Sequence, residues 1–136
     1  MTGYLLDTND VVSDLVRNPQ GTVAQRIRKV GETKVCTSII VASELRYGAE
    51  KKGSQRLTTQ LEVVLGALQV LPFDSPADVT YGRVRAQLER VGKPIGGNDL
   101  LIAAHALTLG YTLVSDNTRE FAQVRGLQRE NWLRLS

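Results

Sequence analysis

Gly3-Tyr4-Leu5-Leu6-Asp7-Thr8-Asn9 is the stretch that decides the fold, because it joins a short apolar strand to a carboxylate. Apolar residues then recur at helical spacing from Val11 to Val16, so the chain passes almost directly from this strand into a helix. In an open α/β sheet, ligands bind at the carboxyl ends of central strands. An acid at that place suggests a metal or phosphate site.

Strand-like and helix-like segments alternate along the rest of the chain. Further strands are expected at residues 33–36, 69–71, 112–114 and 132–135. Helices are expected near residues 23–30, 39–51, 57–68, 77–91, 100–109 and 118–124. This alternation predicts one α/β domain over residues 1–136, with a parallel sheet covered by helices on both faces. The two helices between the second and third strands are expected to form a helical arm beside the sheet.

Composition indicates an ordinary globular protein that remains in the cytoplasm. Apolar residues make up 42% of the chain and charged residues 23%. No apolar run approaches the ~20 residues that span a bilayer, and the N-terminus does not resemble a signal peptide. The single cysteine, Cys36, cannot form an internal disulfide and is expected to be a small core residue.

The charge balance gives a modest indication of a polyanionic partner. The formal net charge is +3, and twelve of the 17 basic residues are arginine, which contacts phosphate in a bidentate manner. If four acids gather around a cation, the remaining surface becomes still more basic.

Four acids stand out: Asp7, Glu44, Asp99 and Asp116. Asp7 and Asp116 each follow a predicted strand, and Asp99 begins the most apolar helix. Glu44 lies on an apolar helical stripe with no cation at the neighbouring positions, so the usual helical ion pair is absent. Carboxylates held close together repel unless a cation lies between them. Oxygen ligands suit Mg²⁺ or Mn²⁺, whereas the chain lacks the Cys/His spacing of a zinc site.

Each acid also has an ordinary structural interpretation. Asp7 and Asp99 could each simply stabilise the N-terminus of the helix that follows, although Asn98 is the better cap for the helix at residues 100–109. Glu44 could form a salt bridge with a distant arginine. Asp116 could serve a turn or pair with Arg119.

Four segments together resemble the PIN-domain proteins, and within them the VapC-type toxins of toxin–antitoxin pairs. The resemblance covers essentially the whole chain. Its segments are Leu5-Leu6-Asp7-Thr8-Asn9, Ser43-Glu44-Leu45-Arg46-Tyr47-Gly48, Gly97-Asn98-Asp99-Leu100-Leu101-Ile102-Ala103-Ala104-His105-Ala106 and Ser115-Asp116-Asn117-Thr118-Arg119-Glu120-Phe121.

The resemblance implies a three-layer fold with five parallel strands and a Mg²⁺-dependent endoribonuclease, in which Mn²⁺ can substitute. Asp7, Glu44, Asp99 and Asp116 would be its catalytic and metal-binding acids. Thr8 and Asn9 would be accessory, Thr8 through its hydroxyl and Asn9 by ordering the site. The partners implied are an RNA substrate, a cognate antitoxin, a second copy in a homodimer and a toxin–antitoxin hetero-oligomer. Operator DNA would be contacted only through the antitoxin, and no membrane is involved.

Two positions depart from the family pattern. Asp10 stands where the family usually has an aliphatic residue, and it is expected to favour the helix N-terminus rather than join the site. Val41 replaces a common threonine and removes one hydroxyl from the pocket.

The hypothesis that follows is metal-assisted hydrolysis of an RNA phosphodiester, leaving a 3′-hydroxyl and a 5′-phosphate. His105 is six residues beyond Asp99 and is expected to be a core or interface histidine rather than a general base.

The principal alternative to a nuclease is a receiver-like phosphoacceptor domain, but no lysine follows the strand that ends at Val114. A phosphatase with Asp7 as nucleophile, or a toxin that binds RNA without cleaving it, are further alternatives.

Overall fold

The computed structural model describes residues 3–7 and 11–133. The strands are Tyr4–Leu6 (β1), Val35–Ser38 (β2), Gln69–Leu71 (β3), Thr112–Val114 (β4) and Arg129–Glu130 (β5). The α-helices within these residues are Ser13–Arg17 (α1), Thr22–Val30 (α2), Ile39–Lys52 (α3), Gln55–Ala67 (α4), Ala77–Arg90 (α5), Gly97–Leu109 (α6) and Thr118–Phe121 (α7).

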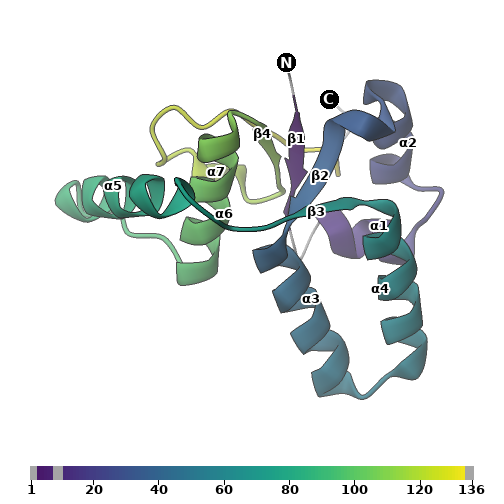
Figure 1. Ribbon diagram of the computed structural model, residues 1–136. Helices are drawn as coiled ribbons and strands as arrows, with labels where there is room; N and C mark the ends of the chain where they lie inside the picture. Colours follow the sequence, from purple (N-terminus) through teal and green to yellow (C-terminus); the bar gives the residue numbers. More distant parts are fainter. Residues whose placement is uncertain (1–2, 8–10, 134–136) are drawn as a thin grey trace.

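The five strands form one parallel sheet in the order β3-β2-β1-β4-β5. The chain builds outward from β1 to β3 on one side and then crosses to place β4 and β5 on the other. The boundary between β1 and β4 is therefore the switch point at which α/β sheets bind ligands. In Figure 1, α5 and α6 lie on one side of the sheet, and α1 and α2 lie on the other. The predicted α/β architecture, with helices on both faces, is confirmed.

The central strands and α6 form the middle of the core. Leu5, Leu6, Leu113 and Val114 are fully buried, as expected for strands covered on both faces. Helix α6, the most apolar helix in the sequence, is buried, and its Ile102, Ala103, Ala104 and Ala106 have no exposed surface. It ends at Gly110, whose φ of 71° is the left-handed conformation that glycine adopts at low cost.

Two predicted strands differ from the structure. The second was predicted at residues 33–36, but β2 covers Val35–Ser38 because Glu32–Lys34 form a short 3₁₀ helix after Gly31. The last was predicted at 132–135, but the paired residues are Arg129–Glu130. Trp132 packs into the core beside Tyr4, with ring centroids 5.2 Å apart, instead of continuing the strand.

Helices α3 and α4 form the predicted arm, which projects from the sheet as an adjacent pair in Figure 1. Leu61 and Leu65 of α4 pack against Ala42 and Ala49 of α3. Gly53, with φ of 62°, ends α3 and allows the chain to turn back into α4. Among residues 3–7 and 11–133, no helix is both long enough and apolar enough to cross a bilayer.

Cys36 lies in β2 and is 2% exposed, so it is a core residue as predicted. Burial raises the pKa of its thiol to about 11. The thiolate is the nucleophile in disulfide exchange, so very little reactive species exists at pH 8 in the folded state. We expect Ellman's reagent to react with Cys36 only at the rate of unfolding, and rapidly in denaturant. Rapid labelling of the native protein at pH 8 would contradict this burial.

Candidate active site

Asp7 and Ser115 meet at the switch point of the sheet. Asp7 follows β1 and is 6% exposed, and Ser115 follows β4 and is fully buried. The Ser115 hydroxyl donates to Asp7 Oδ2 at 2.7 Å, and its oxygen accepts from the Asn117 N–H at 2.9 Å. The Asp7 N–H donates to the Val114 carbonyl at 2.9 Å. A buried carboxylate is costly unless such partners compensate it, so Ser115 fixes the orientation of Asp7.

Asp116 lies on the surface next to this pair, as expected for an acid at the end of β4. Its Oδ1 accepts a hydrogen bond from Asn131 Nδ2 at 2.7 Å. Asn131 Oδ1 in turn accepts from the Leu133 N–H at 2.9 Å. The segment after β5 therefore helps to orient Asp116.

Glu44 lies halfway along α3 and is half-buried, at the rim that its apolar stripe predicted. Asn98 Nδ2 donates to Glu44 Oε2 at 2.8 Å across 54 residues of sequence. The prediction that Asn98 caps α6 is wrong, because Gly96 is the cap residue and no side chain caps this helix. Asn98 instead joins α6 to α3.

Asp99 is half-buried in the first turn of α6, the position predicted from sequence. The segment that leads into α6 is held by Glu120 of α7, whose Oε1 accepts from the Gly96 N–H at 3.2 Å. The other carboxylate oxygen of Glu120 accepts from Asn117 Nδ2 at 2.8 Å. Glu120 is a further carboxylate in this region. The sequence analysis did not predict a role for it beyond its place in the Ser115–Phe121 segment.

The four acids are thus linked in two pairs of neighbouring segments. Ser115, the residue before Asp116, donates a hydrogen bond to Asp7. Asn98, the residue before Asp99, donates one to Glu44. Within residues 3–7 and 11–133, no three His, Cys, Asp or Glu side chains are arranged to hold a metal ion together. Convergence of all four carboxylates on one cation therefore stays a prediction.

The chemistry of the donor set nevertheless fits a hard divalent cation. The donors are carboxylate oxygens, and Asp7 is a buried carboxylate at a strand end. The predicted accessory residues Thr8 and Asn9, and the atypical Asp10, lie outside the described residues.

His105 is a buried residue, as predicted, and is 2% exposed. Its Nδ1 lies 2.8 Å from Ser38 Oγ, and its ring meets Phe73 edge to face at 5.4 Å. Burial lowers its pKa, and smaller effects from Asp74 and the Pro72 backbone oppose that shift. The ring is therefore neutral near neutral pH.

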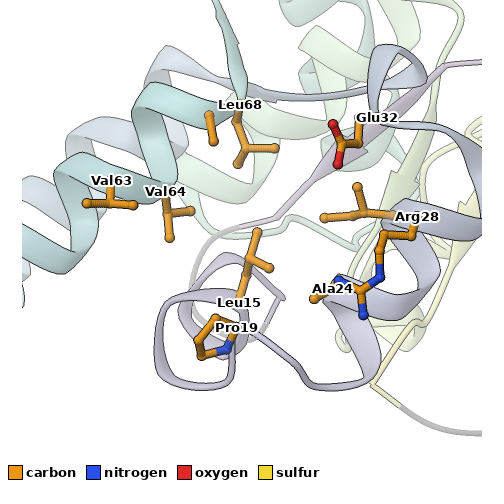
Figure 2. Close-up of a pocket in the computed structure, with 10 residues that line it drawn as sticks. Leu15, Pro19, Ala24, Arg28, Glu32, Val63, Val64 and Leu68 are labelled. Carbon is orange, nitrogen blue, oxygen red and sulfur yellow. The ribbon is translucent and has the colours of Figure 1, made fainter.

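A cleft of about 270 Å³ adjoins Glu44 between α1, α3 and α4. Arg17 and Lys52 line it together with apolar side chains such as Leu45, Leu57 and Leu61. A second hollow of about 250 Å³ lies between α1, α2 and α4 and is shown in Figure 2. None of the four acids lines this second hollow, so it is not part of the candidate active site.

Comparison with known proteins gives a consistent result. Residues 4–127 match the family described as PIN domain. The chain is 40% identical to ribonuclease VapC2 of Haemophilus influenzae, over 98% of this chain and all of that protein. It is 37% identical to the tRNA(fMet)-specific endonuclease VapC of Shigella flexneri, over 97% of this chain and 99% of that protein.

Solved structures show the same similarity. DNA-bound VapBC from Salmonella typhimurium matches with a TM-score of 0.84 at 36% identity, over 97% of this chain and 99% of that one. VapBC2 from Rickettsia felis, bound to a DNA fragment from its promoter, matches with a TM-score of 0.88 at 32% identity and the same coverage.

Proposed function

Because this chain belongs to the PIN-domain family, and to its VapC group, we propose that it is an endoribonuclease and the toxin of a toxin–antitoxin pair. The observation that carries the proposal is Asp7, a buried carboxylate held by Ser115 at the β1/β4 switch point, in a chain whose relatives are described as ribonucleases. Membership of this family favours a nuclease over the receiver-like phosphoacceptor domain.

Each residue has a defined part in the proposed reaction. Asp7, Glu44, Asp99 and Asp116 would hold Mg²⁺, or Mn²⁺ in its place. When bound, the cation lowers the pKa of a water molecule and neutralises charge that develops on the phosphate. Ser115 orients Asp7, Asn98 orients Glu44, and Asn131 orients Asp116. Thr8 and Asn9 would add polar contacts in the same region.

The surroundings of the site support a polyanionic substrate. Arg17 and Lys52 lie in the cleft that contains Glu44, and neither forms an ion pair within the described residues. Arg46, which follows Glu44 by two residues, pairs with Glu62. Two cations beside Glu44 would offset repulsion between an RNA strand and that carboxylate.

Partners are proposed from the VapBC neighbours. The chain would bind a cognate antitoxin in the cytoplasm and form a homodimer and a toxin–antitoxin hetero-oligomer. Both DNA-bound neighbours are toxin–antitoxin complexes, so operator DNA would be contacted only through the antitoxin.

Cleavage of RNA by the purified chain tests the proposed function. We expect total RNA to be cut in Mg²⁺ or Mn²⁺, with no cutting in excess EDTA and recovery when Mg²⁺ is restored. End mapping should find 5′-phosphates and 3′-hydroxyls, because water rather than the 2′-hydroxyl attacks. A 2′,3′-cyclic phosphate, or unchanged cutting in EDTA, would contradict the proposed mechanism. No cutting under any metal condition would contradict the nuclease itself.

A further inference from the structure

His105 and Ser38 form a second connection between the two helices that carry Glu44 and Asp99. Ser38 is the N-cap of α3, and its Oγ accepts from the Ile40 N–H at 3.1 Å. The same oxygen lies 2.8 Å from Nδ1 of His105, in the last half of α6. One serine hydroxyl therefore fixes the start of α3 and contacts α6 at the same time.

The roles of donor and acceptor follow from the partners. The Ser38 oxygen already accepts from Ile40, so its own proton is available to donate. The pKa of His105 is lowered by burial, which favours a neutral ring with one lone pair. A neutral ring keeps one acceptor nitrogen, and we assign it to Nδ1, which can accept from the Ser38 hydroxyl.

The two connections between α3 and α6 are spaced alike. Glu44 is six residues after Ser38 on α3, and Asn98 is seven residues before His105 on α6. At 1.5 Å per residue these separations are about 9 and 10.5 Å. Helices α3 and α6 run in opposite directions, so the contact between Ser38 and His105 and the contact between Glu44 and Asn98 can form at the same time. The first contact can therefore be in register only when the second is. A slide of α6 by one turn, about 5.4 Å, would break both hydrogen bonds.

We propose that the hydrogen bond between His105 and Ser38 sets the position of α6 along α3, and thereby places Asn98 and Asp99 opposite Glu44. His105 is then a buried positioning residue for RNA cleavage, about two helical turns along α6 from Asn98. Its effect on activity rests on the nuclease function proposed above. Its effect on the contact between Asn98 and Glu44 does not.

Two N-cap serines provide a matched pair of variants. Ser54 caps α4 as Ser38 caps α3, with its Oγ accepting from the Leu57 N–H at 3.1 Å, and no histidine contacts it. Ser38→Ala and Ser54→Ala each remove one cap hydroxyl, but only Ser38→Ala removes the donor to His105. Any general effect of a lost cap is therefore measured by Ser54→Ala.

The side-chain amide of Asn98 reports the register independently of activity. In ¹⁵N-labelled full-length protein, we expect Ser38→Ala to move the Asn98 Nδ2 resonances toward the position of a solvent-exposed asparagine, and Ser54→Ala to leave them in place. In cleavage assays, Ser38→Ala should lower kcat roughly 10-fold with KM nearly unchanged, since small misplacements of reacting groups are costly. In a Ser38→Ala/Asn98→Ala double variant, kcat should fall no further than in Asn98→Ala, because both changes break one coupled arrangement.

Substitution of the histidine supplies a second test. In His105→Asn, the amide oxygen takes the position of Nδ1 and can accept from Ser38, so kcat should stay close to that of the parent chain. In His105→Leu no acceptor remains, and kcat should fall as in Ser38→Ala. If His105→Leu does not fold, the serine pair alone decides the question.

Several results would overturn the positioning role. These are Asn98 resonances unchanged in folded Ser38→Ala, equal losses in Ser38→Ala and Ser54→Ala, additive losses in the double variant, and equal losses in His105→Asn and His105→Leu. If the parent chain cuts no RNA, the nuclease proposal fails, and the Asn98 resonances still decide whether His105 sets the register.

Discussion

Asp99→Asn is expected to reduce Mg²⁺-dependent RNA cleavage on the order of 10³-fold, because each 1.36 kcal/mol of lost transition-state stabilisation is tenfold in rate and a metal centre supplies several kcal/mol. Asparagine keeps the size of the side chain and removes its negative charge. The variant should therefore fold normally and bind the cation weakly. Initial rates on total RNA at saturating Mg²⁺, with thermal unfolding in parallel, measure both effects.

Asp78→Asn is the matched control for this change. Asp78 lies in the first turn of α5 and is exposed, so it shares with Asp99 the favourable position near a helix N-terminus. The helix-dipole contribution is about 0.3–1 kcal/mol at such positions. Asp78→Asn should lose only that stability and no cleavage. Equal cleavage by the parent chain and Asp99→Asn would remove Asp99 from the site.

Ser115→Ala is expected to lower cleavage about 10- to 100-fold, the usual effect of removing a side chain that orients a metal ligand. The hydroxyl donates to Asp7 Oδ2 at 2.7 Å in a fully buried position, and alanine cannot replace this bond. The loss of that partner should also destabilise the fold by about 1–3 kcal/mol. Urea unfolding and Mn²⁺ titration of the same preparations would separate the loss of stability from the loss of metal affinity.

Ser43→Ala provides the comparison for Ser115→Ala. Ser43 is exposed on α3, one residue before Glu44, and its hydroxyl donates to the Ile39 carbonyl at 2.8 Å. Its removal deletes a hydroxyl whose hydrogen bond has a similar length but goes to a backbone carbonyl, so cleavage and metal affinity should stay near the parent values. If Ser115→Ala keeps full activity, the orientation of Asp7 does not depend on Ser115.

Sequence patterns predicted the strand–helix order and the positions of the acids because both depend on local spacing. Asp7 and Asp116 follow short apolar strands, so their places at the carboxyl ends of neighbouring strands follow from the parallel topology, and Asp99 opens an apolar helix. The predicted bounds of the second and the last strand were wrong. A 3₁₀ helix delays the start of β2, and the packing of Trp132 in the core ends the pairing of β5 early. Trp132 looks like a strand residue, but it packs against Tyr4 in the core.

The residues that orient the acids carry no comparable local signal. Ser115 and Asp7 are 108 residues apart, and Asn98 and Glu44 are 54 apart. Asn98 was predicted to be a cap residue, and that prediction was wrong. The strand order brings β4 beside β1 and so makes Ser115 a neighbour of Asp7, whereas Asn98 meets Glu44 through the packing of α6 beside α3.

The central place of β1 also affects when the protein becomes able to act during its synthesis. Strand β1 is synthesised long before its neighbour β4, and Asp7 acquires its serine partner only after residue 115 has emerged. Closing so long a loop is slow and cannot be completed by a shorter chain. A nascent or prematurely terminated polypeptide lacking β4 would therefore hold an unassembled centre, in which Ser115 does not yet orient Asp7.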